Sequence, residues 1–273
     1  MKLLLKDQEW RATYNGGGSL RLNPPEEYIE LMKGQHCLHF IHTGKCAGES
    51  IMRALKRDTR RIILLEYHVF DADKSIRSSL ALISKDEPEK HSFVIATRDP
   101  LKRWESSFNW DLHNLVLKRG ISIEKSEFSR YRNVNHLAHG IANKEADALR
   151  LGKWAHMGMG LSFYAPLELQ NRLPQKQTYA IRIENINQDY VTFLKNLSSE
   201  NLSNKVNVSL AKGKEILVPK TKDSYKEDYP PDTFARLKID EINSLKHFLD
   251  NDYKAHNHLL QNFLRQPLTG LHE

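Results

Sequence analysis

Long apolar runs are missing from this 273-residue chain. The first six residues hold three consecutive leucines, fewer than a signal-peptide core requires and far fewer than a membrane span requires. We therefore expect no membrane span. The cytoplasm is the simplest compartment, and a Golgi enzyme that lacks its anchor is the alternative.

Cysteine is almost absent as well, with only Cys37 and Cys46 in the chain. Two cysteines argue against a disulfide framework, although a single pair between them is conceivable, and their spacing forms no CxxC metal motif. Histidines are more frequent, but no HExxH pattern occurs. His36, His39 and His42 recur at every third position, a spacing that alternates between the two faces of a strand. We therefore expect no metal site.

The amino-acid composition favours a soluble globular domain that binds an acidic ligand. Hydrophobic residues make up 40% of the chain, which is enough for a sizeable core. The formal charge of +7 suits an acidic ligand or a polyanionic substrate. No recognised nucleic-acid motif is present, so we expect no nucleic-acid partner. A non-enzymatic module that binds polyanions remains an alternative.

Segments typical of strands and of helices alternate along the chain. Strands are predicted at 36–42, 61–66, 92–97 and 178–183, and helices at 49–56, 73–83, from 99 onward, 187–197, 232–250 and 253–264. Strands separated by helices predict a parallel sheet that helices cover, in a single α/β domain over 1–273. Ligands of such sheets bind at the carboxyl ends of the strands.

The segment His39–Ser50 is the most informative part of the sequence. An apolar run ends in small residues around Lys45, and Gly48 and Ser50 then open a helix. Backbone N–H groups and the helix dipole favour a bound anion at such a turn, and the lysine adds a full positive charge. The segment Phe93–Pro100 repeats this plan with an arginine. Two anion sites at two strand-to-helix turns predict a ligand with two separated phosphates.

A nucleoside-triphosphate loop of the pattern GxxxxGK[ST] does not fit these residues. Gly44 and Lys45 match it, but His39 stands at the first glycine and Cys46 replaces the hydroxyl residue that holds Mg²⁺. A kinase-like phosphotransferase that uses ATP and Mg²⁺ is therefore disfavoured and is kept as an alternative.

The loop HTGKCAGES at 42–50 resembles the PKTGGTS-type loop of PAPS-dependent sulfotransferases. The segment TRDPLKRWESSF at 97–108 resembles the RDPLxRxxSxY segment of the same family, and 181–186 carries a fainter similarity. The most similar branch is that of the carbohydrate sulfotransferases with the heparan and chondroitin uronyl enzymes. The first loop departs from the family pattern at Gly44, Cys46, Ala47 and Glu49.

This resemblance implies a three-layer P-loop-like fold with a central parallel sheet flanked by helices. It implies the donor 3′-phosphoadenosine 5′-phosphosulfate (PAPS), the product PAP, and metal-independent transfer of a sulfuryl group to a hydroxyl, with a saccharide as the expected acceptor. Arg98 and Ser106 would bind the 3′-phosphate, and Lys45 would also neutralise charge on the bridging oxygen. The loop residues implied to hold the 5′-phosphosulfate are Lys45, Cys46, Ala47, Gly48, Glu49 and Ser50.

The acceptor hydroxyl also needs a base. Tyr67-His68-Val69-Phe70 follows the second predicted strand and resembles a His-x-x-Phe-like segment of the uronyl enzymes, in which the histidine is the base. A histidine pKa near 6.5 suits this task, so His68 is the predicted base. Glu66 is the alternative, because other sulfotransferases use a glutamate.

On the basis of this resemblance, the chain divides into an arm, a core, an insertion and a C-terminal part. We expect an irregular arm with a short helix near 26–32, and an acceptor site in the insertion. Trp154 and Met157–Gly160 either line that site or pack in the core. The lysines at 205, 212, 214, 220 and 222 either form a solvated loop or attract an anion. The predicted parts are the arm 1–35, the PAPS-binding core 36–110, the insertion 111–175, and the last strand, lysine-rich loop and terminal helices 176–273.

Overall fold

A computed structural model describes most of the chain as two compact units. Unit 1 consists of Met1–Thr97, Tyr164–Leu217 and Asn257–Glu273, and unit 2 of Arg98–Phe163 and Val218–His256. The predicted helices at 26–32 and 73–83, His68 and the lysines of 205–222 lie outside the described residues. The described residues are 4–6, 9–13, 34–59, 62–67, 87–198, 231–238 and 242–265.

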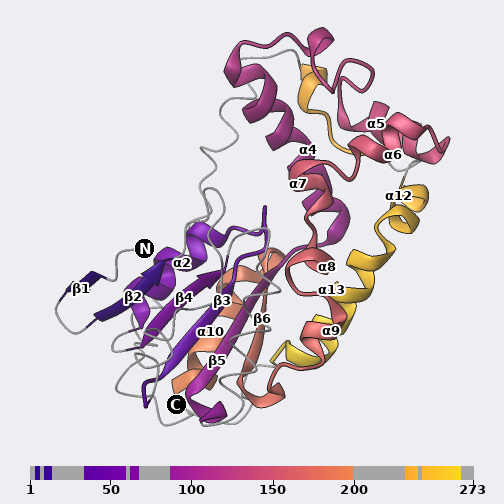
Figure 1. Cartoon of the computed structure of the whole chain (residues 1–273). Coiled ribbons are helices and arrows are strands. Elements are labelled where there is room, and N and C mark those ends of the chain that lie inside the picture. The colour runs from indigo at the N-terminus through magenta and orange to yellow at the C-terminus, as the bar shows by residue number, and fades with distance from the viewer. Residues whose placement is uncertain are drawn as a thin grey trace. The chain divides into compact units, whose positions relative to one another are not determined.

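Unit 1 is built on a six-stranded sheet of order β1-β2-β4-β3-β5-β6 (Figure 1). Strands β2 to β6 run parallel, and β1 is antiparallel to β2. The predicted α/β class with a parallel sheet is therefore confirmed. The strands are β1 Leu4–Lys6, β2 Glu9–Thr13, β3 Cys37–Ile41, β4 Ile63–Tyr67, β5 His91–Thr97 and β6 Thr178–Arg182.

The first two strands were not predicted, since the sequence suggested an irregular arm over 1–35. β2 pairs in parallel with β4, with Arg11 opposite Leu64, and so extends the sheet at that edge. A strand of five residues carries little hydrophobic signal of its own. Its conformation depends on backbone hydrogen bonds to β4, which lies far away in sequence.

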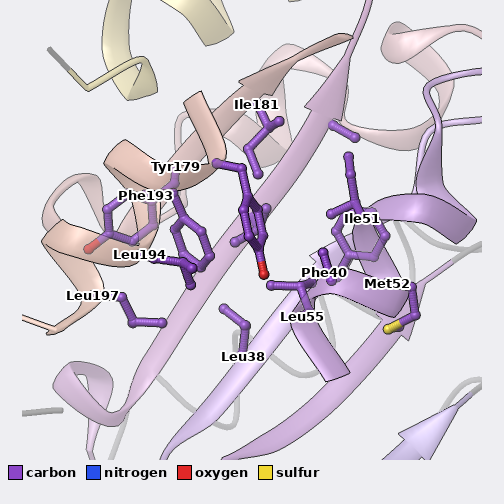
Figure 2. Close-up of a cluster of buried hydrophobic side chains, with 14 of the residues drawn as sticks. Leu38, Phe40, Ile51, Met52, Leu55, Tyr179, Ile181, Phe193, Leu194 and Leu197 are labelled. Atoms are coloured by element: carbon purple, nitrogen blue, oxygen red, sulfur yellow. The ribbon is translucent and has the colours of Figure 1, made fainter. Parts of the chain in front are cut away.

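Helices α2 (Gly48–Asp58) and α10 (Ile186–Leu197) pack their apolar faces on the sheet. Both agree with the predicted segments within two residues. Figure 2 shows side chains from both helices converging over β3 and β6. Full burial of one such side chain contributes about 1.5–3 kcal/mol, so this cluster fixes the position of α2 on the sheet. The labelled residues are Leu38, Phe40, Ile51, Met52, Leu55, Tyr179, Ile181, Phe193, Leu194 and Leu197.

The side chains on the opposite face of β3 and β5 are also buried. Ile41, Phe93 and Ile95 are fully buried, and the His39 ring stacks on the Phe93 ring with centroids 4.6 Å apart. Strands buried on both faces are typical of parallel sheets and explain the nearly continuous apolar runs in the sequence.

Unit 2 is mainly helical and has its own hydrophobic core. Trp104 and Phe108 of its first helix are fully buried in this core, and Trp104 Nε1 donates a hydrogen bond to the Gly152 carbonyl at 3.0 Å. Its helices are α4 Pro100–Asp111, the π-helical turn Leu112–Val116, α5 Val134–Ala142, α6 Ala146–Leu151, α7 Ala155–Gly158 and α12 Ile242–Phe248.

Two helices span the boundary between the units in the sequence, and several other elements are short. Helix α13 (Asp250–Phe263) begins in unit 2 and ends in unit 1, and α8 (Leu161–Tyr164) also crosses the division, whereas α9 (Leu167–Gln170) belongs to unit 1. Short 3-10 turns occupy Pro88–Lys90, Leu117–Arg119, Ile123–Lys125, Gln175–Gln177, Ile183–Asn185 and Pro231–Phe234.

The predicted continuous helix over 232–250 is wrong, because residues 235–238 are irregular. Leu237 N donates to Glu105 Oε2 at 3.1 Å, and Lys238 N donates to Asn135 Oδ1 at 2.9 Å. Side chains of α4 and α5 thus satisfy backbone groups that would otherwise bond within a helix. Partners far away in the sequence decide this conformation.

Candidate functional site

The two predicted anion-binding segments leave the sheet from neighbouring strands. β3 is followed by α2 and then β4 on one side, whereas β5 is followed later in the chain by β6 on the other side. The order of the strands therefore reverses between β3 and β5, which is where ligands of open α/β sheets bind. The Lys45 loop follows β3, and Arg98 directly follows Thr97, the last residue of β5.

The Lys45 loop has an unusual backbone conformation. Lys45 and Ala47 have positive φ angles of 64° and 51°, which non-glycine residues rarely adopt. The amides of Ser50 and Ile51 both donate to the Ala47 carbonyl, at 3.0 and 3.1 Å. The first N–H groups of a helix lack an acceptor within the helix, and such groups favour a bound anion.

Thr43 provides a second indication of a ligand at this turn. Its side chain is fully buried, and its Oγ1 has no hydrogen-bond partner among the described residues. A buried, unsatisfied hydroxyl costs about 1–3 kcal/mol, so such groups are rare unless something binds them. An anion in the loop would supply the acceptor. Thr43 lies inside the loop at 42–50, and only its burial distinguishes it from an ordinary loop threonine.

The side chains of the predicted loop residues point to different environments. Cys46 is fully buried within the core that α2 shares with the sheet, so only its backbone can contact a ligand. Ser50 is also buried, whereas Glu49 is exposed and Lys45 is half-buried. The loop therefore offers one cationic side chain and several backbone groups, but no contribution from the thiol.

His42 and Glu66 form a buried pair that the sequence did not reveal. His42 follows β3, Glu66 lies in β4, and the imidazole Nδ1 is 2.7 Å from the carboxylate Oε1. The ring lies against Gly48, where an added Cβ would come within 1.8 Å of Nε2. Gly48 is thus required by close packing, and Glu66, the alternative base, is held by a histidine. The predicted base His68 lies outside the described residues.

The second predicted segment opens α4 in unit 2. The Asp99 side chain accepts a hydrogen bond from Lys102 N at 3.1 Å and caps the helix, and Pro100 occupies its first turn. Arg98 and Ser106 are half-buried. Arg98 precedes the cap and Ser106 lies in the second turn of the helix, whereas the Lys45 loop belongs to unit 1.

Comparison with known proteins adds no family to these observations. No protein-family model, curated protein or solved structure matches the chain. Within the described ranges, none of the helices combines the length and apolar character that crossing a bilayer requires. A functional assignment therefore depends on the chemistry of the loop and of the α4 segment.

Proposed function

We propose that this protein is a PAPS-dependent sulfotransferase with a P-loop-like fold, which transfers a sulfuryl group to a hydroxyl of a carbohydrate acceptor. One observation carries the proposal. The two cationic turns, at Lys45 and Arg98, follow the two strands between which the strand order reverses. The buried and unpartnered hydroxyl of Thr43 supports a ligand at the first turn, because nothing among the described residues satisfies it.

PAPS carries negative charge on its 5′-phosphosulfate and on its 3′-phosphate. Lys45 and the backbone N–H groups at the start of α2 suit the first group, with the Ser50 hydroxyl as a further donor. Arg98 and Ser106 suit the second, since a guanidinium can bind a phosphate with two parallel hydrogen bonds. Cys46 and Ala47 contribute through the backbone.

Sulfuryl transfer resembles phosphoryl transfer in its catalytic requirements. The donor and acceptor must be aligned, and charge that develops on the bridging oxygen must be neutralised. Lys45 supplies that charge, and the acceptor proton passes to a base. From sequence that base is His68, with Glu66 as the alternative.

The burial of Cys46 favours this donor over a complex of ATP with Mg²⁺. The residue at this position in a nucleoside-triphosphate loop turns a hydroxyl towards the metal. Here the side chain is a thiol and is packed in the core of unit 1. The phosphotransferase alternative therefore lacks its metal-binding group at the loop.

Isothermal titration calorimetry without Mg²⁺ tests the proposal. PAP should bind the wild-type protein much more tightly than ADP or ATP. Lys45→Ala should weaken PAP binding roughly 10- to 100-fold, because a hydrogen bond to a charged group contributes about 1.5–3 kcal/mol. Lys176→Ala, at an exposed lysine of unit 1, is the matched control and should bind like the wild type. Equal affinity for PAP and ADP would refute the assignment.

A further inference from the structure

The buried pair of His42 and Glu66 lies at the carboxyl end of the sheet in unit 1. Glu66 is opposite Phe40 in the parallel register of β4 and β3, so both side chains lie on the face of the sheet that α2 covers. His42 comes two residues after Phe40, and the two rings stack with centroids 5.6 Å apart. Both members of the pair are therefore on the side of the sheet where α2 begins.

One imidazole ring separates the Glu66 carboxylate from the first turn of α2. Nδ1 of His42 is 2.7 Å from Glu66 Oε1, whereas Nε2 lies where an added Cβ at Gly48 would come within 1.8 Å of it. Gly48 belongs to the turn that would hold the 5′-phosphosulfate in the proposed function. The carboxylate is thus one ring away from the candidate donor turn, and both belong to the same compact unit.

The two oxygens of the Glu66 carboxylate have different surroundings. Oε1 bonds to His42, whereas Oε2 accepts no hydrogen bond from any described residue. The Glu66 side chain is only 8% exposed, yet the fully enclosed atoms without a partner include Thr43 Oγ1 and not Glu66 Oε2. Oε2 is therefore both unpartnered and accessible. A carboxylate buried for packing alone would have both oxygens bonded, because leaving part of a buried charge unsatisfied is costly.

His42 determines which oxygen of Glu66 is accessible. Its ring packs against Phe40 and Gly48, and from there Nδ1 holds Oε1. A ring N–H that donates to one carboxylate oxygen fixes the orientation of the whole group and leaves the other oxygen to accept a proton. The histidine thus acts on the carboxylate, and the carboxylate presents the reactive atom.

Other ionisable side chains near the end of β3 have different positions. His39 alternates with Phe40 along the strand and so points to the opposite face, where its Nε2 lies 3.0 Å from His91 Nδ1. The charged side chains of the loop and the first turn of α2 are Lys45, which is half-buried, and Glu49, which is exposed. Glu66 is therefore a carboxylate that is both buried and next to the candidate donor turn.

We propose that His42 is a positioning residue, which holds Glu66 so that Oε2 takes the proton of the acceptor hydroxyl. The inference rests on the proposed function and selects Glu66 over His68 as the base. The acceptor oxygen bonds to sulfur while the bond from sulfur to the bridging phosphate oxygen breaks. The electron pair of that bond leaves on PAP, the hydroxyl proton moves to Oε2, and solvent takes it up after the products leave.

The first test measures sulfate transfer from saturating ³⁵S-labelled PAPS to heparosan, to desulfated chondroitin and to water. Glu66→Gln keeps an oxygen that accepts from His42 but loses the basic carboxylate. It should lower kcat about 10²- to 10⁴-fold, the usual contribution of a general base, and remove the rise of kcat with pH. PAP affinity should stay within about 2-fold, because the base acts in the transition state. Glu168→Gln, at an exposed glutamate of α9 in unit 1, is the matched control and should behave like the wild type.

The second test compares two substitutions of His42. An asparagine amide can still donate to Oε1 from near the position of Nδ1, whereas leucine has no donor. His42→Leu should lower kcat about 10- to 100-fold, the effect of losing one hydrogen bond to a charged group, and His42→Asn should retain most of the activity. A residue that only fills space would give equal kcat values for the two variants. If thermal unfolding shows that the leucine variant does not fold, His42→Gln, whose amide nitrogen lies nearer the position of Nε2, replaces it.

Calorimetry with PAP separates the possible failures. If the wild type binds PAP and transfers sulfate while Glu66→Gln keeps its turnover and pH profile, the inference is wrong and the proposed function stands. The same holds if His68→Gln removes the pH dependence and Glu66→Gln does not. Equal kcat values for the two His42 variants overturn the positioning role. A wild type that binds PAP but transfers sulfate to none of the three probes overturns the inference and the transfer reaction, and one that does not bind PAP overturns the donor as well.

Discussion

His42 and Glu66 link the carboxyl ends of two neighbouring parallel strands, with Nδ1 2.7 Å from Oε1. The imidazole occupies the space next to the Gly48 Cα, where any side chain would collide with it. The buried pair therefore holds the first turn of α2 against the end of β4. Because that turn is the proposed anion site, the pair connects the packing of the sheet to the shape of the candidate donor site.

Gly48→Ala should displace the His42 ring, since the new Cβ would lie 1.8 Å from Nε2. We expect a loss of about 1–3 kcal/mol of stability, typical of overpacking, and weaker PAP binding. Urea unfolding and calorimetry measure the two effects. His42→Ala in the same chain removes the collision, so the double variant should be less destabilised than the two single losses added together. Additive losses would show that the ring and the glycine are not coupled.

Elements whose signals are local in the sequence were predicted, whereas an element that depends on a distant strand was not. β3, α2, β5 and α10 were predicted within a few residues, because their apolar patterns and cap residues are local. β2 was missed, because its pairing with β4 crosses about fifty residues of chain that leave no local trace.

The candidate site divides in the same way. The Lys45 loop could be predicted because a strand, small residues, a lysine and a helix start are consecutive in the sequence. The contact between His42 and Glu66 depends on strand order, and the spacing of residues in a single sequence carries no signal for it.

Stability should fall as the pH falls, because of a second buried pair in the sheet. His39 Nε2 lies 3.0 Å from His91 Nδ1. Burial lowers the pKa of His91 to about 4, and burial with the charge of His91 holds the pKa of His39 well below its usual value. Both rings are thus neutral in the folded state, whereas the unfolded chain binds protons below about pH 6.5.

The stabilising effect is therefore complete above about pH 6.5 and is lost as the pH falls towards 4, by up to about 1.4 kcal/mol per pH unit for each histidine. Urea unfolding at several pH values measures this slope. The double variant His39→Leu with His91→Leu should show a smaller slope over the same range. An unchanged slope would assign the acid sensitivity to other groups.

Neither cysteine should react with a thiol reagent in the folded protein. Burial, with a smaller effect of Glu87, raises the pKa of the Cys37 thiol to about 12, so almost no thiolate forms near pH 8. Cys46 is fully buried in the core of unit 1. Both thiols should become reactive in denaturant, and Cys37→Ser assigns the remaining signal to Cys46. Rapid reaction of Cys46 without denaturant would mean that the loop does not hold this side chain in the core.

Thr43→Val should affect stability and binding in opposite directions. The buried Oγ1 has no partner among the described residues, and valine has nearly the same shape, so the ligand-free protein should be as stable as the wild type or slightly more stable. If the hydroxyl binds the donor, PAP affinity should fall about 5- to 10-fold, which corresponds to one hydrogen bond of about 1 kcal/mol. Thr43→Ser keeps the hydroxyl and should retain most of the affinity. A valine variant that is less stable and binds PAP normally would assign Thr43 to the packing of the loop. A hydroxyl that bonds only to the ligand adds no stability to the ligand-free protein, so its removal should not destabilise that state.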